Sequence, residues 1–191
     1  AQARADRLGS LSERANLMRI FDLLTSLNPG ISASKAKVHL ATWNGEDDPL
    51  DVYLAGHFEE WQRWQTRRNF ERDLVISLIS LAGPDRWLFA GVFQSKGATW
   101  HPEADLHYYD LIEDSSCREL NGRLVANFSR PGRQPYLNAE SWTESITLAE
   151  IYPERLSIGE FPGFKAVNLT RDELGTVISN SLDSWRASLS N

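Results

Sequence analysis

The stretch DLVISLISLAGPDRWLFAGVFQ, residues 73–94, contains two long apolar runs joined by the tetrapeptide GPDR. Glycine, proline and aspartate in a short connection are typical of a tight turn between paired strands. Both runs are apolar at consecutive positions, as in strands that are covered on both faces. We therefore expect an antiparallel pair at the centre of a curved sheet or barrel.

Further segments around this pair also have the composition of strands or helices. Strands are predicted at KVHLAT (37–42), LHYYDLIE (106–113), GRLVANF (122–128), SITLAEIY (145–152) and, more briefly, FKAVNL (164–169). Helices are predicted at 10–27, with Ser10 or Ser12 as N-cap, at 56–70, and at 170–191, where Thr170 and Glu173 form a capping-box pattern. The predicted fold class is α+β, a small curved sheet or pseudo-barrel of about six strands flanked by N-terminal, central and C-terminal helices. We expect a helical segment at 1–30, a barrel-like domain at 31–169 and helices at 170–191.

Length and composition limit the class of protein. The chain has 191 residues, 41% of them hydrophobic and 24% charged, with a formal net charge of -6. No apolar run approaches the roughly 18 residues of a membrane span, so we expect no membrane partner. The single cysteine, Cys117, cannot form an internal disulfide, which favours a reducing, cytoplasmic setting.

The segment GHFEEWQRWQTRRNF, residues 56–70, combines aromatic, amide and basic side chains. On a helical wheel Phe58, Trp61 and Trp64 share one side, but Gln65 and Arg68 fall in the same arc. A buried helical stripe normally excludes polar groups. The segment is therefore either a packing helix with unusual residues or the edge of a helix that lines a pocket.

Sequence patterns for catalysis and metal binding are weak. The segment HPEADLH (101–107) matches no standard zinc spacing, and the acidic turn NGEDDPLD (44–51) lacks the residue order of a calcium loop. There is no G-x-S-x-G motif, and the glycines do not form a phosphate-binding loop. We expect no catalytic residue, no metal ligand and no cofactor in this chain.

The number of tryptophans and the grouping of the arginines are unusual in this chain. There are seven tryptophans, several of them among polar residues, and a nucleobase stacked on such a ring gains roughly 1 to 3 kcal/mol. The arginines gather at Arg63, Arg67, Arg68 and Arg72, and again in SRPGRQP (129–135). The net charge argues against indiscriminate adhesion to nucleic acid, but it leaves room for two local phosphate contacts.

Several of these pieces together resemble the N-terminal region of a family of bacterial GIY-YIG nuclease proteins. They are KVHLATW, HFEEWQRWQTRRNF, LISLAGPDRWLFAGVFQ with its Phe-x-Gly-x-aromatic motif at 89–93, YYDLIED, GRLVANF, and FPGFKAVNLTRDELGTVISNSLDSWRASLSN with its PGF tripeptide at 162–164. The resemblance covers residues 36–191, but neither a GIY nor a YIG tripeptide is present. It implies a specificity region whose nuclease domain, with its divalent metal, lies outside this chain. The strand pattern is also similar to the PUA-like barrels, including the SRA, EVE and YTH readers of modified bases.

Two hypotheses follow from these observations. The first is a DNA-recognition domain of a modification-dependent restriction endonuclease, which binds double-stranded, modified DNA and holds a base in an aromatic pocket. The alternative is a non-catalytic structural or protein-interaction domain of a nuclease-associated defence protein, with its arginines ion-paired locally, such as Arg63 with Glu59. For the first hypothesis the base-pocket candidates are Trp43, Asn44, Asp47, Tyr53, Trp61, Gln62, Gln65 and Trp142, and the DNA-backbone candidates are Arg67, Arg68, Arg130, Arg133 and Gln134.

Overall fold

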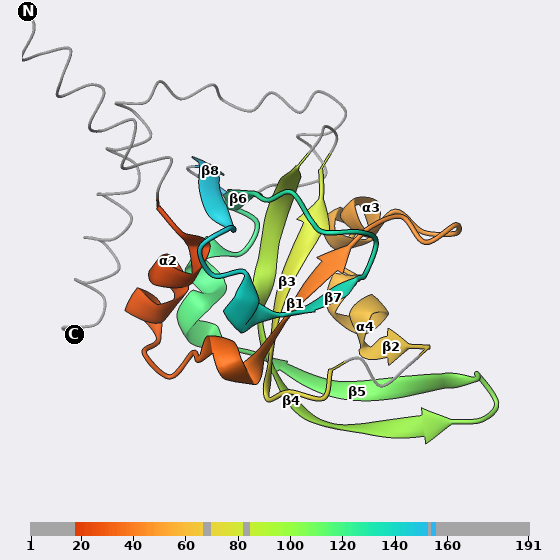
Figure 1. The fold of residues 1–191 in the computed structure, drawn as a ribbon. Helices are drawn as coiled ribbons and strands as arrows, with labels where there is room; N and C mark the ends of the chain where they lie inside the picture. Colours follow the sequence, from red (N-terminus) through yellow and green to blue (C-terminus); the bar gives the residue numbers. More distant parts are fainter. Residues whose placement is uncertain (1–17, 67–69, 82–84, 153, 156–191) are drawn as a thin grey trace, which may run out of the picture.

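The computed structural model describes residues 18–66, 70–81, 85–152 and 154–155. This part of the chain is α+β, with one mixed sheet that curls into a half-barrel and helices packed against it (Figure 1). The strands are β1 (Ala36–Ala41), β2 (Trp64–Gln65), β3 (Leu74–Ser80), β4 (Arg86–His101), β5 (Leu106–Glu113), β6 (Leu124–Asn127), β7 (Tyr136–Asn138) and β8 (Thr147–Ile151). Six of them follow the order β2-β5-β4-β3-β1-β7, and β6 and β8 branch from β4. The predicted fold class is confirmed.

The predicted central hairpin is present as β3 and β4. The two strands are antiparallel, and their register places Val75 opposite Phe93 and Ile79 opposite Leu88. The register shifts after Ser77, opposite Gly91, which has a φ of 124°. A β-carbon at Gly91 would lie 3.0 Å from the amide nitrogen of Asn121, so glycine permits the close approach of that side chain.

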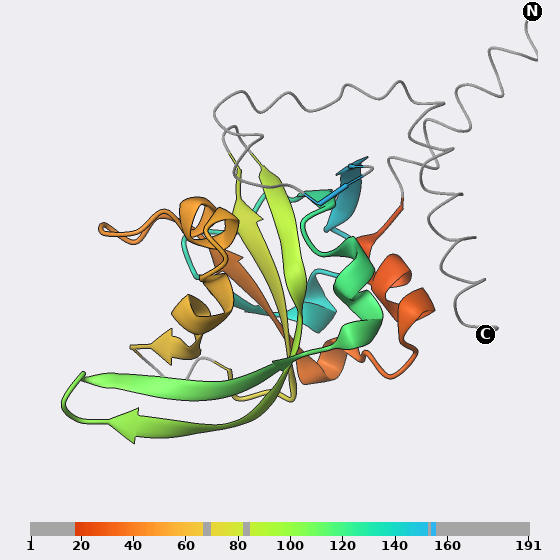
Figure 2. The same cartoon turned by 180° about the vertical axis from the view of Figure 1, so that it is seen from behind.

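Helical segments cover both faces of the sheet. They are α2 (Ile20–Leu27), η1 (Ala33–Lys35), α3 (Pro49–Leu54), α4 (Phe58–Arg63), η2 (Ser115–Leu120) and η3 (Ala139–Ser141), the η segments being 3₁₀ helices. On one face Leu24 of α2 and Leu120 of η2 are buried in a core with Phe89 of β4. On the other face Leu50 of α3 and Phe58 of α4 are buried in a second core. Figures 1 and 2 show α2 and the pair α3 and α4 on opposite sides of the sheet.

The crossover between the parallel strands β1 and β3 positions the second core. β1 pairs with β3 in parallel. After the end of β1 the chain must therefore return to the sheet edge where β1 began before β3 can start, and α3, α4 and β2 make this crossover. Asp48 caps α3 by accepting a hydrogen bond from the backbone N–H of Leu50 at 3.0 Å, and Pro49 occupies the first helical position. The acidic turn before α3 is therefore a helix start.

Strands β4 and β5 continue past the body of the molecule as a two-stranded arm (Figure 2). Within the arm the register pairs Ala98 with Tyr109 and Trp100 with His107. The arm makes β4 much longer than the predicted strand at 87–94.

Several predicted elements differ from the structure. The helix expected at 56–70 ends at Arg63, because Trp64 and Gln65 are extended and pair with β5. In the helix expected at 10–27, α2 begins only at Ile20, since Arg19 is extended and forms a bridge with Thr147. The prediction missed α3, η2 and β7. The predicted strand at 164–169, the helix at 170–191 and the expected caps at Ser10 and Ser12 lie outside the described residues.

Candidate functional site

The predicted base-pocket residues do not form one site. Trp43 is 69% exposed in the loop before α3. The side-chain oxygen of Asn44 accepts hydrogen bonds from the backbone N–H groups of Glu46 and Asp47, and thus closes the turn. A carboxylate oxygen of Asp47 accepts from the indole N–H of Trp61 at 3.3 Å. These residues hold the turn against α4.

Gln62 and Gln65 belong to a closed polar cluster beneath α4. The Oε1 atom of Gln62 accepts a hydrogen bond from the hydroxyl of Ser77 at 2.7 Å and lies 3.1 Å from Nδ1 of His39. All three side chains are buried. Gln65 donates to the backbone carbonyl of Gln62 at 2.5 Å and accepts from the hydroxyl of Tyr136.

Aromatic rings enclose the buried imidazole of His39. The ring of Tyr136 stacks on it at a centroid distance of 4.7 Å, and Phe70 packs edge-on at 5.7 Å. Burial lowers the pKa of His39 to about 4, only partly offset by its hydrogen bond with Gln62. The imidazole is therefore neutral near pH 7, and because Oε1 of Gln62 is an acceptor, Nδ1 carries the proton. The cluster is buried, and within the described part of the chain the Nε2 atom of Gln62 has no hydrogen-bond partner.

The remaining predicted residues lie elsewhere. Trp142 packs edge-on against Phe128 at 5.8 Å, in the core beneath α2. Arg130 lies over the ring of Trp87 at 5.8 Å, while Arg133 and Gln134 are exposed in the loop before β7. Arg67 and Arg68 lie outside the described residues.

Arg63 and Arg72, the other arginines of the first cluster, have structural roles. Arg63 donates to the hydroxyl of Tyr108 and to the carbonyl of Leu111, each at 3.0 Å, and its ion pair is with Glu60 at 3.6 Å rather than with Glu59. Arg72 binds the carboxylate of Glu140 and donates to the backbone carbonyls of Ala33 in η1 and Ala36 at the start of β1.

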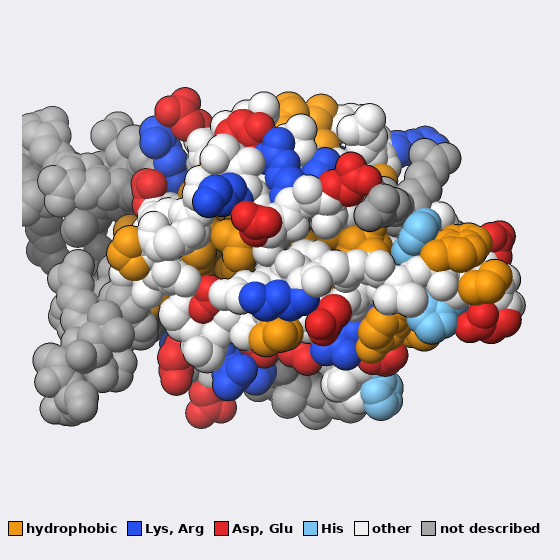
Figure 3. Space-filling view, turned by 90° about the horizontal axis from the view of Figure 1, so that it is seen from below, with side chains coloured by type: hydrophobic (Ala, Val, Ile, Leu, Met, Phe, Trp, Pro, Cys, Tyr) orange, Lys and Arg blue, Asp and Glu red, His pale blue; other side chains and the backbone are white. Residues whose placement is uncertain are grey.

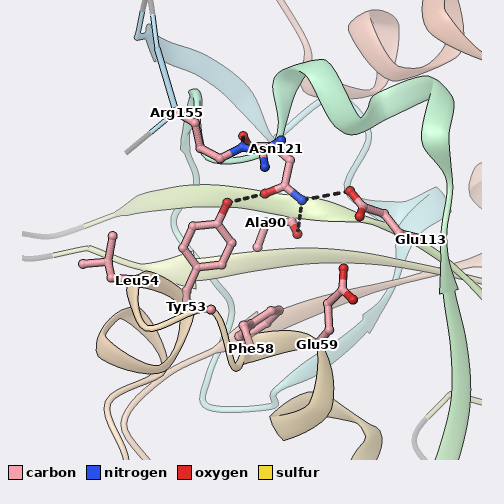
Figure 4. Close-up of a pocket in the computed structure, with 9 residues that line it drawn as sticks. Tyr53, Leu54, Phe58, Glu59, Ala90, Glu113, Asn121 and Arg155 are labelled. Carbon is pink, nitrogen blue, oxygen red and sulfur yellow. Dashed lines mark hydrogen bonds between the residues drawn. The ribbon is translucent and has the colours of Figure 1, made fainter. Parts of the chain in front are cut away.

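Of the predicted base-pocket residues, Tyr53 lines a hollow. The hollow lies between α3 and α4 on one side and β4, β5 and the end of η2 on the other (Figure 4), with a volume of about 310 Å³. This value is at the lower end of the roughly 300 to 1,000 Å³ that small-molecule sites occupy. Its lining consists of Tyr53, Leu54, Gly56, Phe58, Glu59, Ala90, Glu113, Asn121 and Arg155.

Asn121 organises this hollow. Its side-chain oxygen accepts a hydrogen bond from the hydroxyl of Tyr53, and its amide nitrogen donates to the carbonyl of Ala90 at 2.9 Å and to Glu113 Oε1 at 3.1 Å (Figure 4). Burial raises the pKa of Tyr53 to about 12, although the nearby charge of Arg155 opposes the shift. The phenol is therefore neutral at ordinary pH, and its proton is directed at Asn121.

Two carboxyl groups face the hollow, one from α4 and one from β5. Figure 4 shows Glu59 and Glu113 directed toward the same space. Partial burial raises the pKa of Glu59, and the neighbouring carboxyl group of Glu113 adds to the shift. Arg118 forms an ion pair with Glu113 at 3.5 Å. The hollow thus has two carboxyl groups in its lining, from α4 and from β5.

Arginines border the hollow at the loop between η2 and β6. Arg155 donates to the backbone carbonyls of Asn121 and Arg118, each at 2.9 Å, and Arg123 donates to those of Tyr152 and Glu119. Gly122 makes this arrangement possible, because it has a φ of 76° and a β-carbon there would lie 2.6 Å from both Arg155 Cγ and the hydroxyl oxygen of Tyr53.

Sequence reasoning missed most of this site. Glu59, Glu113, Asn121 and Arg155 come from four separate segments, and none carries a motif. The Asn-Gly dipeptide at 121–122 was the one local signal, since it is typical of a turn with positive φ.

A second hollow, also of about 310 Å³, lies at the base of the arm beside Phe70, Arg72, Asp73 and Tyr109. The arm itself carries an aromatic surface, with Trp100 against His107 at 4.7 Å and Trp64 against Tyr108 at 4.8 Å. Figure 3 shows hydrophobic, histidine and acidic side chains together at this end of the molecule.

The described residues offer neither a metal site nor a membrane-spanning helix. Among the described residues no group of three or more His, Cys, Asp or Glu side chains is placed to hold a metal ion. None of the helices in the described part of the chain is long and apolar enough to cross a membrane. No family model, curated protein or solved structure matches the chain.

Proposed function

We propose that this chain is a DNA-recognition domain that holds an extruded, modified base in the hollow beside Tyr53. The observation that carries the proposal is the combination of an aromatic wall, Tyr53 and Phe58, with a fixed amide and two carboxyl groups in one small hollow. Proteins that flip a base stack it against such rings and read its edge by hydrogen bonds. The volume suits one base better than a larger ligand.

The arginines at the rim support binding to a phosphate backbone. Arg118 is more than half exposed. Arg155 is also exposed, and its hydrogen bonds to two backbone carbonyls hold the guanidinium group at the rim of the hollow. Guanidinium groups in such positions bind phosphate oxygens. We assign backbone contacts to this rim first, and to Arg130, Arg133 and Gln134 only as outer contacts.

The parent activity that fits this domain is a modification-dependent restriction endonuclease of the GIY-YIG type acting in the cytoplasm. The support is the resemblance of residues 36–191 described above. In this proposal the domain positions the nuclease, takes no part in the chemistry and holds no metal.

A protein-interaction domain is the second candidate. The observation in its favour is that, among the described residues, the large hydrophobic side chains of Trp43, Trp100 and Ile112 are 69%, 46% and 50% exposed. Exposed apolar side chains of this size often mark a contact with another protein. Trp43 lies on the loop before α3, Trp100 on the arm and Ile112 on β5, and none of the three lines the hollow.

Fluorescence anisotropy with labelled duplexes tests the first proposal. Each duplex carries one modified base, and its unmodified twin is the reference. We expect tighter binding of at least one modified duplex, with affinity falling steeply as salt rises. Tyr53→Ala should remove the preference and Trp43→Ala should leave it intact. Equal, negligible binding to every duplex, or loss of the preference in Trp43→Ala alone, would overturn the proposal.

A further inference from the structure

The arm formed by β4 and β5 has one covered edge and one open edge. The edge of β5 is covered by β2, which pairs with it through Trp64 and Gln65. β4 pairs with β3 only as far as Gln94, and the N–H of Ser95 then donates to the backbone carbonyl of Asp73 at 2.8 Å. Beyond Ser95 no strand in the described part of the chain pairs with the outer edge of β4 (Figure 2).

This open edge lacks the usual protection along most of its length. Proteins commonly protect the exposed backbone N–H and C=O groups of an edge strand with a bulge, a lysine or a proline. Here the register shift lies at the base of the arm, between Ser95 and Ala98, where Lys96 also lies. Pro102 lies in the turn at the tip. Residues 98–101 between these features are extended and have none of them, so they can pair with another strand.

The side chains along the edge change in size in one direction. Small residues come first and large ones last, in the order Gly97, Ala98, Thr99, Trp100, His101. The side chain of Trp100 is 46% exposed. When two copies of this strand pair antiparallel about Thr99, each Trp100 falls opposite an Ala98 of the other copy. The edge is therefore complementary to itself in size.

The charges of the arm also favour an antiparallel pair of copies. Lys96 lies at the base of the arm, whereas Glu103 and Asp105 lie in the turn at its tip, and all three are exposed. In an antiparallel pair the two tips point in opposite directions. The carboxylates of each tip then approach Lys96 of the other copy, and the two acidic tips stay apart.

The second hollow lies where the tip of a paired arm would arrive. Its lining of about 310 Å³ includes Glu71 and Asp73 from the segment before β3, and Ser95 and Gly97 from β4. A strand laid along the open edge must end at this segment, so its turn would lie over the hollow. Because Glu71 and Asp73 are acidic, the attraction for the turn must come from Lys96 rather than from the hollow.

We infer that the open edge of β4 pairs with the same edge of a second copy of this chain, antiparallel and centred on Thr99. The two arms then form one continuous ribbon with twofold symmetry. The contact is smaller than a standard protein interface, so the dissociation constant of the dimer is on the order of 10 μM. The inference goes beyond the proposed function and does not depend on it, because none of the paired residues lines the hollow beside Tyr53.

Sedimentation velocity of the whole chain tests the pairing. We expect the dimer fraction to rise with concentration between about 1 and 200 μM. Lys96→Glu and Glu103→Lys should each weaken the dimer by about tenfold, because each places like charges at both symmetric contacts. An equimolar mixture of the two variants should form a heterodimer about as strong as the original dimer, since opposite charges then meet at both contacts.

Lys35→Glu is the matched control, since Lys35 is exposed in η1 and does not belong to the arm. It makes the same change of charge and should leave the dimer unchanged. A chain that is monomeric at every concentration would overturn the inference and leave the open edge to a strand of another protein. A dimer that is insensitive to both arm variants, or a mixture no stronger than either variant alone, would also overturn it. None of these results would touch the proposed function.

Cross-linking at the twofold axis tests the register. Antiparallel strands hold paired Cα atoms about 4.5 to 5.5 Å apart, which is within the range of a disulfide. Thr99→Cys should therefore form a covalent dimer under mild oxidation, whereas Ser34→Cys, an exposed position in η1, should not. The native Cys117 is buried and should stay reduced in both. Equal cross-linking of the two variants would overturn the pairing about Thr99.

Discussion

Two polar clusters lie on either side of Phe58 beneath α4, and they differ in one respect. The cluster of His39, Gln62 and Ser77 is fully buried, whereas the cluster of Glu59, Glu113 and Asn121 opens into a hollow. Glu59 and Gln62 are three residues apart on the same short helix. One turn of helix thus separates a polar core from a candidate binding site.

The protein environment suppresses charge in both clusters, by different means. In the closed cluster burial lowers the pKa of His39 to about 4, and the imidazole stays neutral. In the open cluster burial and the neighbouring carboxyl group raise the pKa of Glu59. The closed cluster uses its hydrogen bonds for stability, and the open one keeps carboxyl oxygens available to a ligand.

Gln62→Leu should have the largest effect on stability. It removes the acceptor of both the Ser77 hydroxyl and the His39 ring and leaves two buried donors without a partner. Each such donor costs about 1 to 3 kcal/mol, so we expect a loss of about 2 to 6 kcal/mol in denaturant unfolding. Duplex binding by the folded variant should stay within about threefold of the unchanged protein. An unchanged unfolding midpoint would show that the cluster is not a closed core.

The pH dependence of stability should reveal His39. Its pKa is lower in the folded protein, at about 4, than the ordinary value of 6.5, so the unfolded chain binds more protons between these values. The stabilisation is complete above about pH 6.5 and falls as the pH drops toward 4, by about 3 kcal/mol in total.

Urea unfolding of the protein and of His39→Leu at several pH values measures this effect. In His39→Leu the free energy of unfolding should no longer fall between about pH 6.5 and pH 4 because of this group. An identical slope in both proteins would contradict a buried neutral imidazole.

Tyr53→Phe should have a moderate effect on stability and a clear effect on binding. The hydroxyl that holds Asn121 is lost, which costs about 1 kcal/mol. Asn121 and Glu113 are then less firmly placed, and we expect affinity for the preferred duplex to fall by about threefold to tenfold.

Tyr108→Phe is the matched control for this change. It also removes a partly buried hydroxyl, one bonded to Arg63 and Glu60 beside the arm. It should cost similar stability and leave binding unchanged. Equal losses of affinity in the two variants would show that Tyr53 has no special role.

Glu59→Gln should change stability least. The raised pKa of Glu59 means that its stabilising contribution is complete below the unfolded value of 4.5 and is lost as the pH rises through the folded value. Because the side chain is largely exposed, we expect only a few tenths of a kcal/mol. Above that pH the variant should match or exceed the unchanged protein in thermal unfolding, and a lower melting temperature there would contradict the raised pKa of Glu59.

The strands of the central sheet could be predicted from the sequence better than the residues that line the hollow. The hairpin of β3 and β4 followed from two apolar runs and a turn, because strand burial and turn chemistry are local properties. The end of α4 at Arg63 did not follow from helical periodicity, because Trp64 and Gln65 pair with His107 and Tyr108, more than 40 residues away. Tyr53 was predicted as a pocket residue, whereas Asn121 and Glu113 depend on long-range packing around Gly91 and Gly122.

The most direct test of the open and closed clusters follows two side-chain amides in one NMR sample. Asn121 lines the hollow and Gln62 lies in the closed cluster, so their NH₂ resonances report on the two environments separately. During titration with the tightest-binding duplex, the Asn121 resonances should shift and saturate while those of Gln62 stay in place. Saturable binding that moves the Gln62 resonances and leaves those of Asn121 unchanged would contradict the assignment of the hollow as the binding site.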